Sequence, residues 1–159
     1  MPVDIGLKYD ERIGVVHILN TLLADFYTIY TTVWSYHWNL TGPFFGPLHT
    51  MFGEEYEAVQ TMIDNIAERS RALGGRPDGS LSSIVKRTRL KENQGEFPSA
   101  EEMVTNLLAD YEQLVRFARK DERLCDGKYH DRVTSNFIMN LVEKLEKFSW
   151  KLRATSKKG

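Results

Sequence analysis

Residues 36–69, YHWNLTGPFFGPLHTMFGEEYEAVQTMIDNIAER, contain a Gly/Pro-rich break between two segments of helical apolar periodicity. Gly terminates helices readily, and Pro cannot continue a helix but fits its first turn. The break therefore predicts that one helix, over residues 11–40, ends here and that a second, over residues 47–73, begins here. Gly74 and Gly75 supply the stop for the second helix.

Three further helices are predicted along the chain. Ser80 precedes a short helical pattern over residues 81–87. Ser99 and Glu102 have the spacing of a capping box before a helix over residues 99–124, and Asp131 is a suitable N-cap for a last helix over residues 131–152. The first stripe expected to face the core starts at Ile13, and that of the last helix is Val133, Phe137, Leu141, Leu145, Phe148 and Leu152.

Four long helices, a long connection over residues 76–98 and the lack of a strand pattern define the predicted fold class. It is all-α, a ferritin-like four-helix bundle whose long crossover carries the short helix. We expect one domain, residues 1–159, with short flexible tails at about 1–7 and 155–159.

Bulk composition narrows the functional class. The formal net charge of −1 argues against nucleic-acid binding driven by overall charge. The single cysteine, Cys125, excludes an internal disulfide framework and suits a reducing compartment. The N-terminus lacks the pattern of a signal peptide, and no run approaches the ~20 apolar residues that span a bilayer. We therefore expect a cytoplasmic protein without a membrane partner.

Two histidines and two carboxylates of this stretch are candidate metal ligands. Asp64 and Glu68 are four residues apart on one predicted helix, so they share a face. His37 lies on the apolar side of the first helix and His49 in the first turn of the second. Imidazole with carboxylate oxygens suits a first-row metal such as iron. The alternative is a solvated acidic face, with Glu68 or Arg69 in a surface ion pair, and two ordinary hydrogen-bonded histidines.

Helix geometry limits how these residues can combine. His49 and Asp64 are 15 residues apart on one continuous helix, which separates them by about 22 Å along its axis. Either they share no site, or two chains pair antiparallel through a two-fold axis and form two equivalent sites. No Glu-x-x-His occurs in the sequence, which argues against a di-iron centre inside one bundle.

The combined pattern resembles the Dps family of mini-ferritins, the DNA-binding proteins from starved cells. The resemblance rests on the His-Trp-Asn run beginning at His37, the Gly-Pro-x-Phe break, Leu-His ending at His49, and Asp-x-Ile-Ala-Glu-Arg beginning at Asp64. The C-terminal pattern Glu146-Lys-x-x-Trp-x-x-Arg-Ala is also similar, so the resemblance covers nearly the whole chain.

This resemblance implies a hollow homo-oligomer, a dodecamer, that oxidises Fe(II), preferably with hydrogen peroxide, and stores a ferric core. It also implies that His37 and His49 bind iron (Fe2+/Fe3+) from one subunit, with Asp64 and Glu68 from its two-fold mate. Trp38, next to His37, is then either an electron donor that quenches a stray oxidant or a packing residue at the interface.

Two features depart from the family pattern. Asn136 stands where many members have an acidic pore residue, and Arg132 adds positive charge, with Asp126 and Asp131 as partial compensation. The tails also lack a lysine-rich extension, and the C-terminal cations are Lys151, Arg153, Lys157 and Lys158. A DNA-coating nucleoid protein, in which metal chemistry is secondary, is the alternative function, and a metal-free helical interaction protein is a third. For His17, His130 and Cys125 we expect ordinary structural roles.

Overall fold

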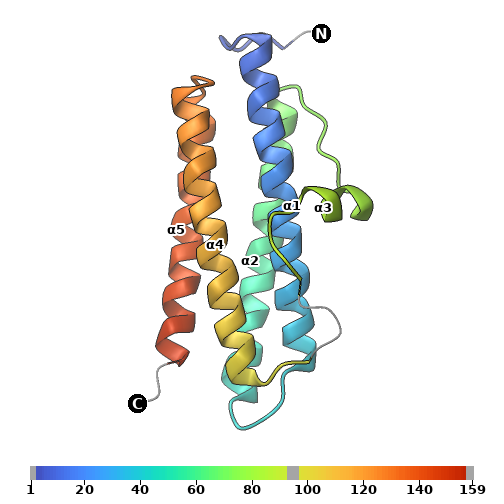
Figure 1. Ribbon diagram of the computed structural model, residues 1–159, viewed down its shortest axis with the longest axis vertical. Coiled ribbons are helices and arrows are strands. Elements are labelled where there is room, and N and C mark those ends of the chain that lie inside the picture. The colour runs from blue at the N-terminus through green and yellow to red at the C-terminus, as the bar shows by residue number, and fades with distance from the viewer. Residues whose placement is uncertain (1–2, 93–96, 157–159) are drawn as a thin grey trace.

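The computed structural model describes residues 3–92 and 97–156 and is built from five helices (Figure 1). Their bounds are α1 Tyr9–Asn39, α2 Phe45–Ala72, α3 Leu81–Arg87, α4 Ala100–Gly127 and α5 Arg132–Ser156. No strand occurs in the described part of the chain. The predicted all-α four-helix bundle with a short helix in its crossover is therefore confirmed, while the C-terminal Lys157 and Lys158 lie outside the described residues.

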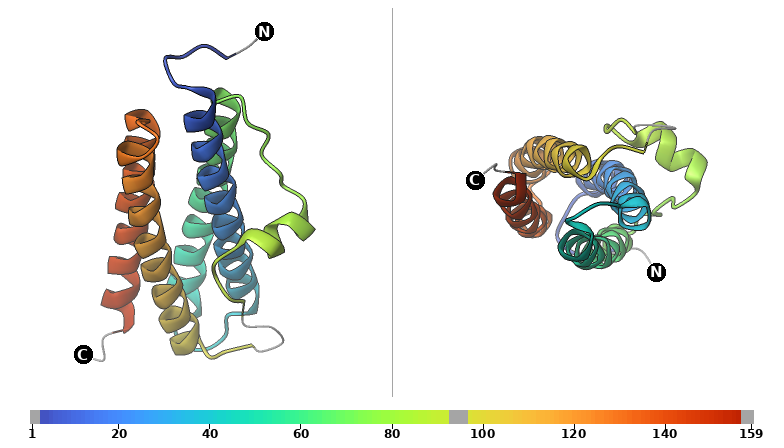
Figure 2. Two further views of the ribbon diagram at one scale, coloured as in Figure 1. Left: turned by 45° about the horizontal axis from the view of Figure 1, so that its top comes forward. Right: turned by 90° about the horizontal axis from the view of Figure 1, so that it is seen from below.

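Two antiparallel helix pairs make the bundle. α1 packs mainly on α2, and α4 mainly on α5. The connection from α2 returns along the whole bundle, so α2 and α4 run in the same direction, and α3 lies outside the four-helix core across α1 (Figure 2). The long crossover, which the sequence predicted, is thus the feature that places α4 beside α1.

The core consists of the predicted apolar stripes with two exceptions. Val133 and Ile13 were expected to face inward and are instead 64% and 40% exposed. At the start of α5 the inward positions belong to Thr134 and Ser135, whose hydroxyls bond to Asp131 and Glu122. Because these polar residues take the buried face, the first turn is rotated and Val133 points outward.

The helix ends follow capping chemistry, with shifts of a few residues from the predicted bounds. α2 ends as expected: Gly74 has φ +82°, and the Gly75 amide donates to the Ser70 carbonyl at 2.9 Å. The Ser99 capping box and the Asp131 cap are also present, the latter accepting from the Thr134 amide at 3.0 Å. α4 does not stop at residue 124 but continues through Gly127, and α2 begins at Phe45, two residues before the predicted start.

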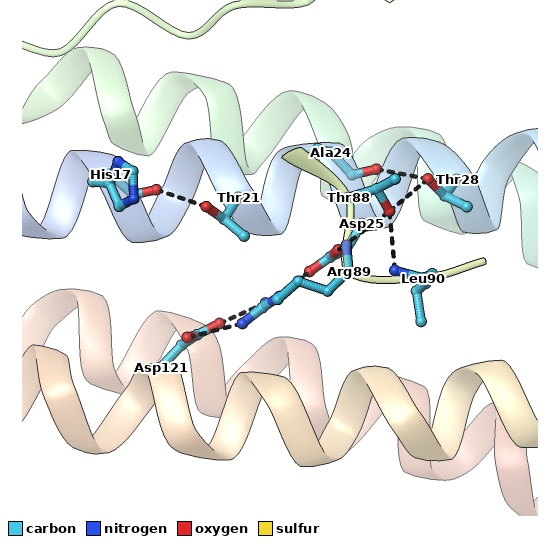
Figure 3. A network of polar contacts seen from close by, with 9 residues as sticks. All are labelled: His17, Thr21, Ala24, Asp25, Thr28, Thr88, Arg89, Leu90 and Asp121. Atoms are coloured by element: carbon cyan, nitrogen blue, oxygen red, sulfur yellow. Dashed lines mark hydrogen bonds and ion pairs between the residues drawn. The ribbon is translucent and has the colours of Figure 1, made fainter. Parts of the chain in front are cut away.

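Arg89 fixes the crossover to the bundle (Figure 3). Its guanidinium lies between Asp25 on α1 and Asp121 on α4, with closest contacts of 2.7 Å to each carboxylate. The Arg89 amide also donates to Asp25 at 2.7 Å. Asp25 is fully buried, and burial raises its pKa, which the bonds from Arg89 oppose. This network joins three elements that are distant in sequence.

α1 is long and apolar enough, by length and composition alone, to cross a membrane. The sequence had been interpreted as containing no such run, and the structure corrects that interpretation. Most of the apolar window is buried against the other helices, for example Leu19, Leu22 and Phe26. The hydropathy of α1 is therefore accounted for by its place in the core.

Candidate metal centre

The end of α1 and the first turns of α2 bring His37 and His49 together. Their rings are stacked with centroids 3.7 Å apart. His37 Nδ1 lies 2.9 Å from the carbonyl oxygen of His49, and His49 Nδ1 lies 3.1 Å from the carbonyl oxygen of His37. Gly53, one turn along α2, leaves room for the ring, since a Cβ there would lie 3.4 Å from His37 Cε1.

These reciprocal hydrogen bonds determine the tautomer of both rings. A carbonyl oxygen can only accept, so each Nδ1 must carry a proton and donate. In the neutral imidazole this leaves each Nε2 unprotonated, with its lone pair available. A hydrogen bond of this kind from the second ring nitrogen orients a metal-bound histidine. The histidine pair therefore presents two preoriented nitrogen donors at one corner of the bundle.

Asp64 and Glu68 lie on α2 and are both exposed. Neither carboxylate makes an ion pair within 4.0 Å in the described part of the chain. Asp64 lines an open hollow of about 600 Å³ between α1, α2 and the following loop, together with Tyr27 and Pro77. These two side chains thus offer oxygen donors that form no ion pair with the residues that the structure describes.

One chain does not bring the four residues together. α2 is continuous from Phe45 to Ala72, so His49 and Asp64 remain about 22 Å apart. Among the described residues, no group of three or more His, Cys, Asp or Glu side chains could hold a metal ion. Each chain therefore carries a pair of nitrogen donors and a separate pair of oxygen donors.

Arg69 does not pair with Glu68, as the solvated-face alternative allowed. It extends to the start of α5, where it bonds Asp131 at 3.1 Å and the Thr134 hydroxyl at 2.9 Å. Asp131 is consequently buried, with 2% exposure, and its charge is already balanced. The expectation that Asp131 compensates for Arg132 near a pore is therefore wrong, whereas Arg132, Asn136 and Asp126 are exposed.

The aromatic surroundings of the histidines include residues that the sequence analysis did not single out. Trp38 is 60% exposed and contacts Trp34 in a tilted arrangement, with centroids 4.4 Å apart and ring planes at 49°. The ring that meets His37 edge-on is Tyr56, from α2, at 5.2 Å. Neither Tyr56 nor Trp34 was among the candidate site residues of the sequence analysis. The helical spacing of residues 30, 34 and 38 could have indicated an aromatic stripe on α1.

A second buried acid escaped the sequence analysis. Glu55 is fully buried between the helices, where its only hydrogen bond comes from the Tyr111 hydroxyl at 3.0 Å and Oε1 has no partner among the described residues. Burial raises the pKa of Glu55 to about 7. A single carboxylate and a phenol are too few donors for a metal ion, so this group belongs to the core.

The comparisons with known proteins agree with this architecture. The family profile described as the ferritin-like domain matches residues 16–159, and the chain belongs to that family. A low temperature-induced protein of Nostoc is 41% identical over 152 residues, which cover 96% of this chain and 85% of that protein. DNA protection during starvation protein 2 of Bacillus anthracis is 34% identical, over 88% of this chain and 94% of its own.

A solved structure gives the same assignment. The Dps protein of Vibrio cholerae, described as a member of a broad superfamily of ferritin-like diiron-carboxylate proteins, superposes with a TM-score of 0.90 at 30% identity. The match covers 99% of this chain and 98% of that one. Within the ferritin-like family, the chain is a member of the Dps family.

Proposed function

We propose that this protein is a Dps-like iron-storage and detoxification protein. It oxidises Fe(II), preferably with hydrogen peroxide, at ferroxidase sites between subunits and stores the ferric product in a hollow shell. The observation that carries the proposal is the separation of the donors. The nitrogen pair lies at the start of α2, and Asp64 and Glu68 lie about 22 and 28 Å further along this continuous helix, with no ion-pair partner among the described residues.

Antiparallel pairing of two α2 helices would complete the sites, because each chain carries the nitrogen donors of one site and the oxygen donors of the other. A two-fold axis between the copies brings the His37–His49 pair of one chain to Asp64 and Glu68 of the other, twice. Apolar side chains on the same side of the molecule support such a contact, because Leu81 and Val85 on α3 are 76% and 71% exposed. The hollow beside Asp64 leaves space for the partner copy.

The donor set suits iron as the substrate. Carboxylate oxygens and imidazole nitrogens are ligands that iron accepts, and the site has no thiolate. Carboxylates favour Fe(III) over Fe(II), so they lower the cost of oxidation, while the imidazoles retain the ferrous ion before it reacts. We infer further that residues 1–159 form one ferritin-like domain and that the assembly is a cytoplasmic dodecamer.

Replacement of both histidines tests the catalytic part of the proposal. The double variant His37→Ala/His49→Ala should lose rapid peroxide-driven oxidation of Fe(II), measured by absorbance under anaerobic conditions. The matched control is His17→Ala/His130→Ala, which removes the same number of imidazoles outside the site and should oxidise iron at the wild-type rate. Equal rates in both variants would refute the assignment.

Mixed oligomers test the sharing of sites between chains. The variant lacking His37 and His49 is coexpressed with Asp64→Asn/Glu68→Gln, and each is inactive alone. In a mixed dimer one site receives both intact halves, so random assortment restores about a quarter of the wild-type sites. A site contained in one chain would regain no activity on coexpression, which makes this outcome decisive.

One observation favours DNA coating as a second function. The C-terminal cations are partly engaged, with Lys151 at 3.5 Å from Glu54 and Arg153 at 3.9 Å from Glu112. Instead, the exposed face of α4 carries a basic hollow lined by Arg116, Arg119, Lys120 and Arg123. A relative of this chain is named for DNA protection during starvation.

A gel-shift titration at low salt tests this second function, because contacts to phosphate weaken as salt rises. The triple change Arg116→Glu/Lys120→Glu/Arg123→Glu should abolish retardation if α4 binds DNA. Removal of residues 157–159 is the matched alternative for binding through the tail. Wild-type protein that retards no DNA at any concentration would exclude DNA coating and leave the ferroxidase proposal unaffected.

A further inference from the structure

The bundle has an internal boundary, which we call the seam, between the α1–α2 pair and the α4–α5 pair (Figure 2). Polar links cross it, and two of them involve arginine. Arg89 joins Asp25 of α1 to Asp121 of α4, and Arg69 of α2 bonds to Asp131, just before α5. In each of these three carboxylates both oxygens accept hydrogen bonds.

Glu55 also crosses the seam, but its bonding is incomplete. It lies on the buried face of α2, about one turn from Phe52 and from Val59, and all three side chains are fully buried. Tyr111 of α4 donates its hydroxyl to Glu55 Oε2 at 3.0 Å. Oε1 has no hydrogen-bond partner among the described residues. Glu55 therefore differs from the other seam carboxylates in having one unbonded oxygen in the interior.

The groups that face Glu55 compensate its charge only in part. Lys151 of α5 is the cation that acts on it, but the ammonium lies 3.5 Å from the exposed carboxylate of Glu54, which itself adds a like charge beside Glu55. On α4 the Tyr111 phenol keeps its proton, because burial and the nearby Glu55 and Asp110 raise its pKa. No charged group of α1 acts on Glu55 among the described residues. Burial has the largest effect and raises the pKa of Glu55 to about 7.

We propose that Glu55 is a proton-controlled latch between the two helix pairs: the neutral acid keeps the seam closed, and ionisation favours its opening. A neutral carboxyl leaves one buried polar group unpaired, whereas a carboxylate leaves a buried charge with a single hydrogen bond, which costs much more. Opening admits water to Oε1 and removes that cost. The latch goes beyond the proposed iron chemistry and does not depend on it.

The packing of the helices makes the seam the place where the bundle opens locally. α1 packs mainly on α2 and α4 mainly on α5, so the two pairs contact each other less than the helices do within each pair. Regions with few contacts open at a lower free energy than the whole domain. Ionisation of Glu55 therefore favours a local opening in which each helix pair stays folded.

Linkage gives the sign and the size of the effect. Because the pKa of Glu55 is raised in the closed state, its contribution to closure is fully present below the ordinary value of 4.5 and is lost as the pH rises through 7. With a pKa of about 7 in the closed state and 4.5 in the open state, the opening constant increases about tenfold from pH 6 to pH 8. At higher pH the group is ionised in both states, so the opening constant levels off.

Labelling of buried thiols in the full-length, iron-free protein tests the latch. Val59→Cys places a thiol, the seam thiol, one turn from Glu55, and the native Cys125, buried in the last turn of α4, is the internal reference. Each rate is divided by that of the same thiol in urea-unfolded protein at the same pH, which gives its opening constant. The seam thiol should open more readily than Cys125, with the weaker urea dependence of a local opening, and its constant should rise about tenfold from pH 6 to pH 8.

Matched variants in the Val59→Cys background assign the pH dependence to Glu55. Glu55→Gln cannot ionise and should remove the tenfold rise, and Glu55→Leu, which leaves no polar group to bury, should do the same. Glu57→Gln removes an exposed acid of α2 and should keep the rise. Tyr111→Phe removes the hydrogen bond that lowers the pKa of Glu55, so the rise should move to higher pH, which a merely structural contact would not cause.

Three results would overturn the latch. The first is a seam thiol with the same opening constant at pH 6 and pH 8, and the second is a tenfold rise that persists in both Glu55 variants. The third is an equal opening constant and an equal urea dependence for the seam thiol and Cys125, since only global unfolding would then expose the seam. None of these results bears on whether the protein oxidises iron.

Discussion

Asp25 and Asp64 are both carboxylates on the α1–α2 pair, and their surroundings are opposite. Asp25 is fully buried and receives bonds from the Arg89 amide and guanidinium. Asp64 is exposed and has no ion-pair partner among the described residues. A buried carboxylate that is hydrogen-bonded to a cation stabilises the fold, because removal of its partner leaves an uncompensated charge. An exposed carboxylate without such a partner keeps its oxygen lone pairs available for a ligand.

The histidine pair combines features of both. Its Nδ1 atoms are fully used by backbone carbonyls, as in a structural network, whereas its Nε2 atoms are left over for chemistry. The division between used and unused donor atoms, more than burial or charge alone, separates the proposed site from the rest of the polar residues. Four predictions test this distinction.

The largest effect, on the rate of Fe(II) oxidation, should follow from neutralising the exposed carboxylates of Asp64 and Glu68. Asp64→Asn/Glu68→Gln should slow peroxide-driven Fe(II) oxidation by roughly 100-fold or more, since even changes beyond the ligand shell cost 10–100-fold. The free energy of unfolding should stay within about 0.5 kcal/mol of the wild type, because these side chains are exposed and unpaired. Stopped-flow absorbance and urea titration measure the two quantities. A large loss of stability would show that these acids stabilise the fold, as Asp25 does, and would contradict the prediction.

The opposite result, a large loss of stability, is expected when the buried network of Arg89, Asp25 and Asp121 is broken. Arg89→Ala leaves the buried Asp25 and Asp121 carboxylates without their cation and should cost about 3–5 kcal/mol of unfolding free energy. Urea denaturation followed by circular dichroism measures the loss. Arg87→Ala, a neighbouring arginine without an ion pair among the described residues, is the control. Equal stability of the two variants would contradict the assigned role of Arg89.

Glu55 is an intermediate case, buried but only half satisfied. Its pKa is raised from 4.5 to about 7, so the folded state holds the proton more tightly than the unfolded state. The resulting stability is fully present below pH 4.5 and is lost as the pH rises through 7, by about 3 kcal/mol. Glu55→Gln should flatten this dependence in urea titrations between pH 5 and 8. An unchanged slope would show that Glu55 ionises normally.

The smallest effect is expected for a satisfied pair that is exposed. Arg119 and Glu146 form an ion pair with side-chain exposures of 43% and 48%. Glu146→Gln should change the unfolding free energy by less than about 1 kcal/mol, because water screens the pair. The midpoint of thermal unfolding, compared at low and high salt, checks this. A loss as large as that of Arg89→Ala would show that exposure does not decide the value of these pairs.

The sequence predicted the elements that depend on local signals. The Gly74 stop, the Ser99 box and the Asp131 cap are each set by neighbours within five residues, and all three are confirmed. The stacking of His37 and His49 follows from a tight turn between two helices whose ends could be located. The assignment of the four residues to a shared metal site stays a prediction.

Contacts between distant segments could not be predicted in this way. Arg89 meets Asp25 and Asp121 across 64 and 32 residues, and no local pattern marks those three as partners. Glu55 carries a charge that composition assigns to the surface, yet tertiary packing buries it. Asp131 was expected to compensate for Arg132 at a pore, because the sequence does not show that Arg69, on another helix, pairs with it.

The crossed hydrogen bonds of His37 and His49 have a consequence for evolution and design. Both bonds end on main-chain carbonyls, so the tautomer of each ring does not depend on the identity of any other side chain. Substitution of one histidine leaves the carbonyl that orients the other. A designed helical hairpin that reproduces this crossing, and that keeps a glycine at the position of Gly53 to leave room for the ring, would inherit correctly oriented Nε2 donors from its backbone.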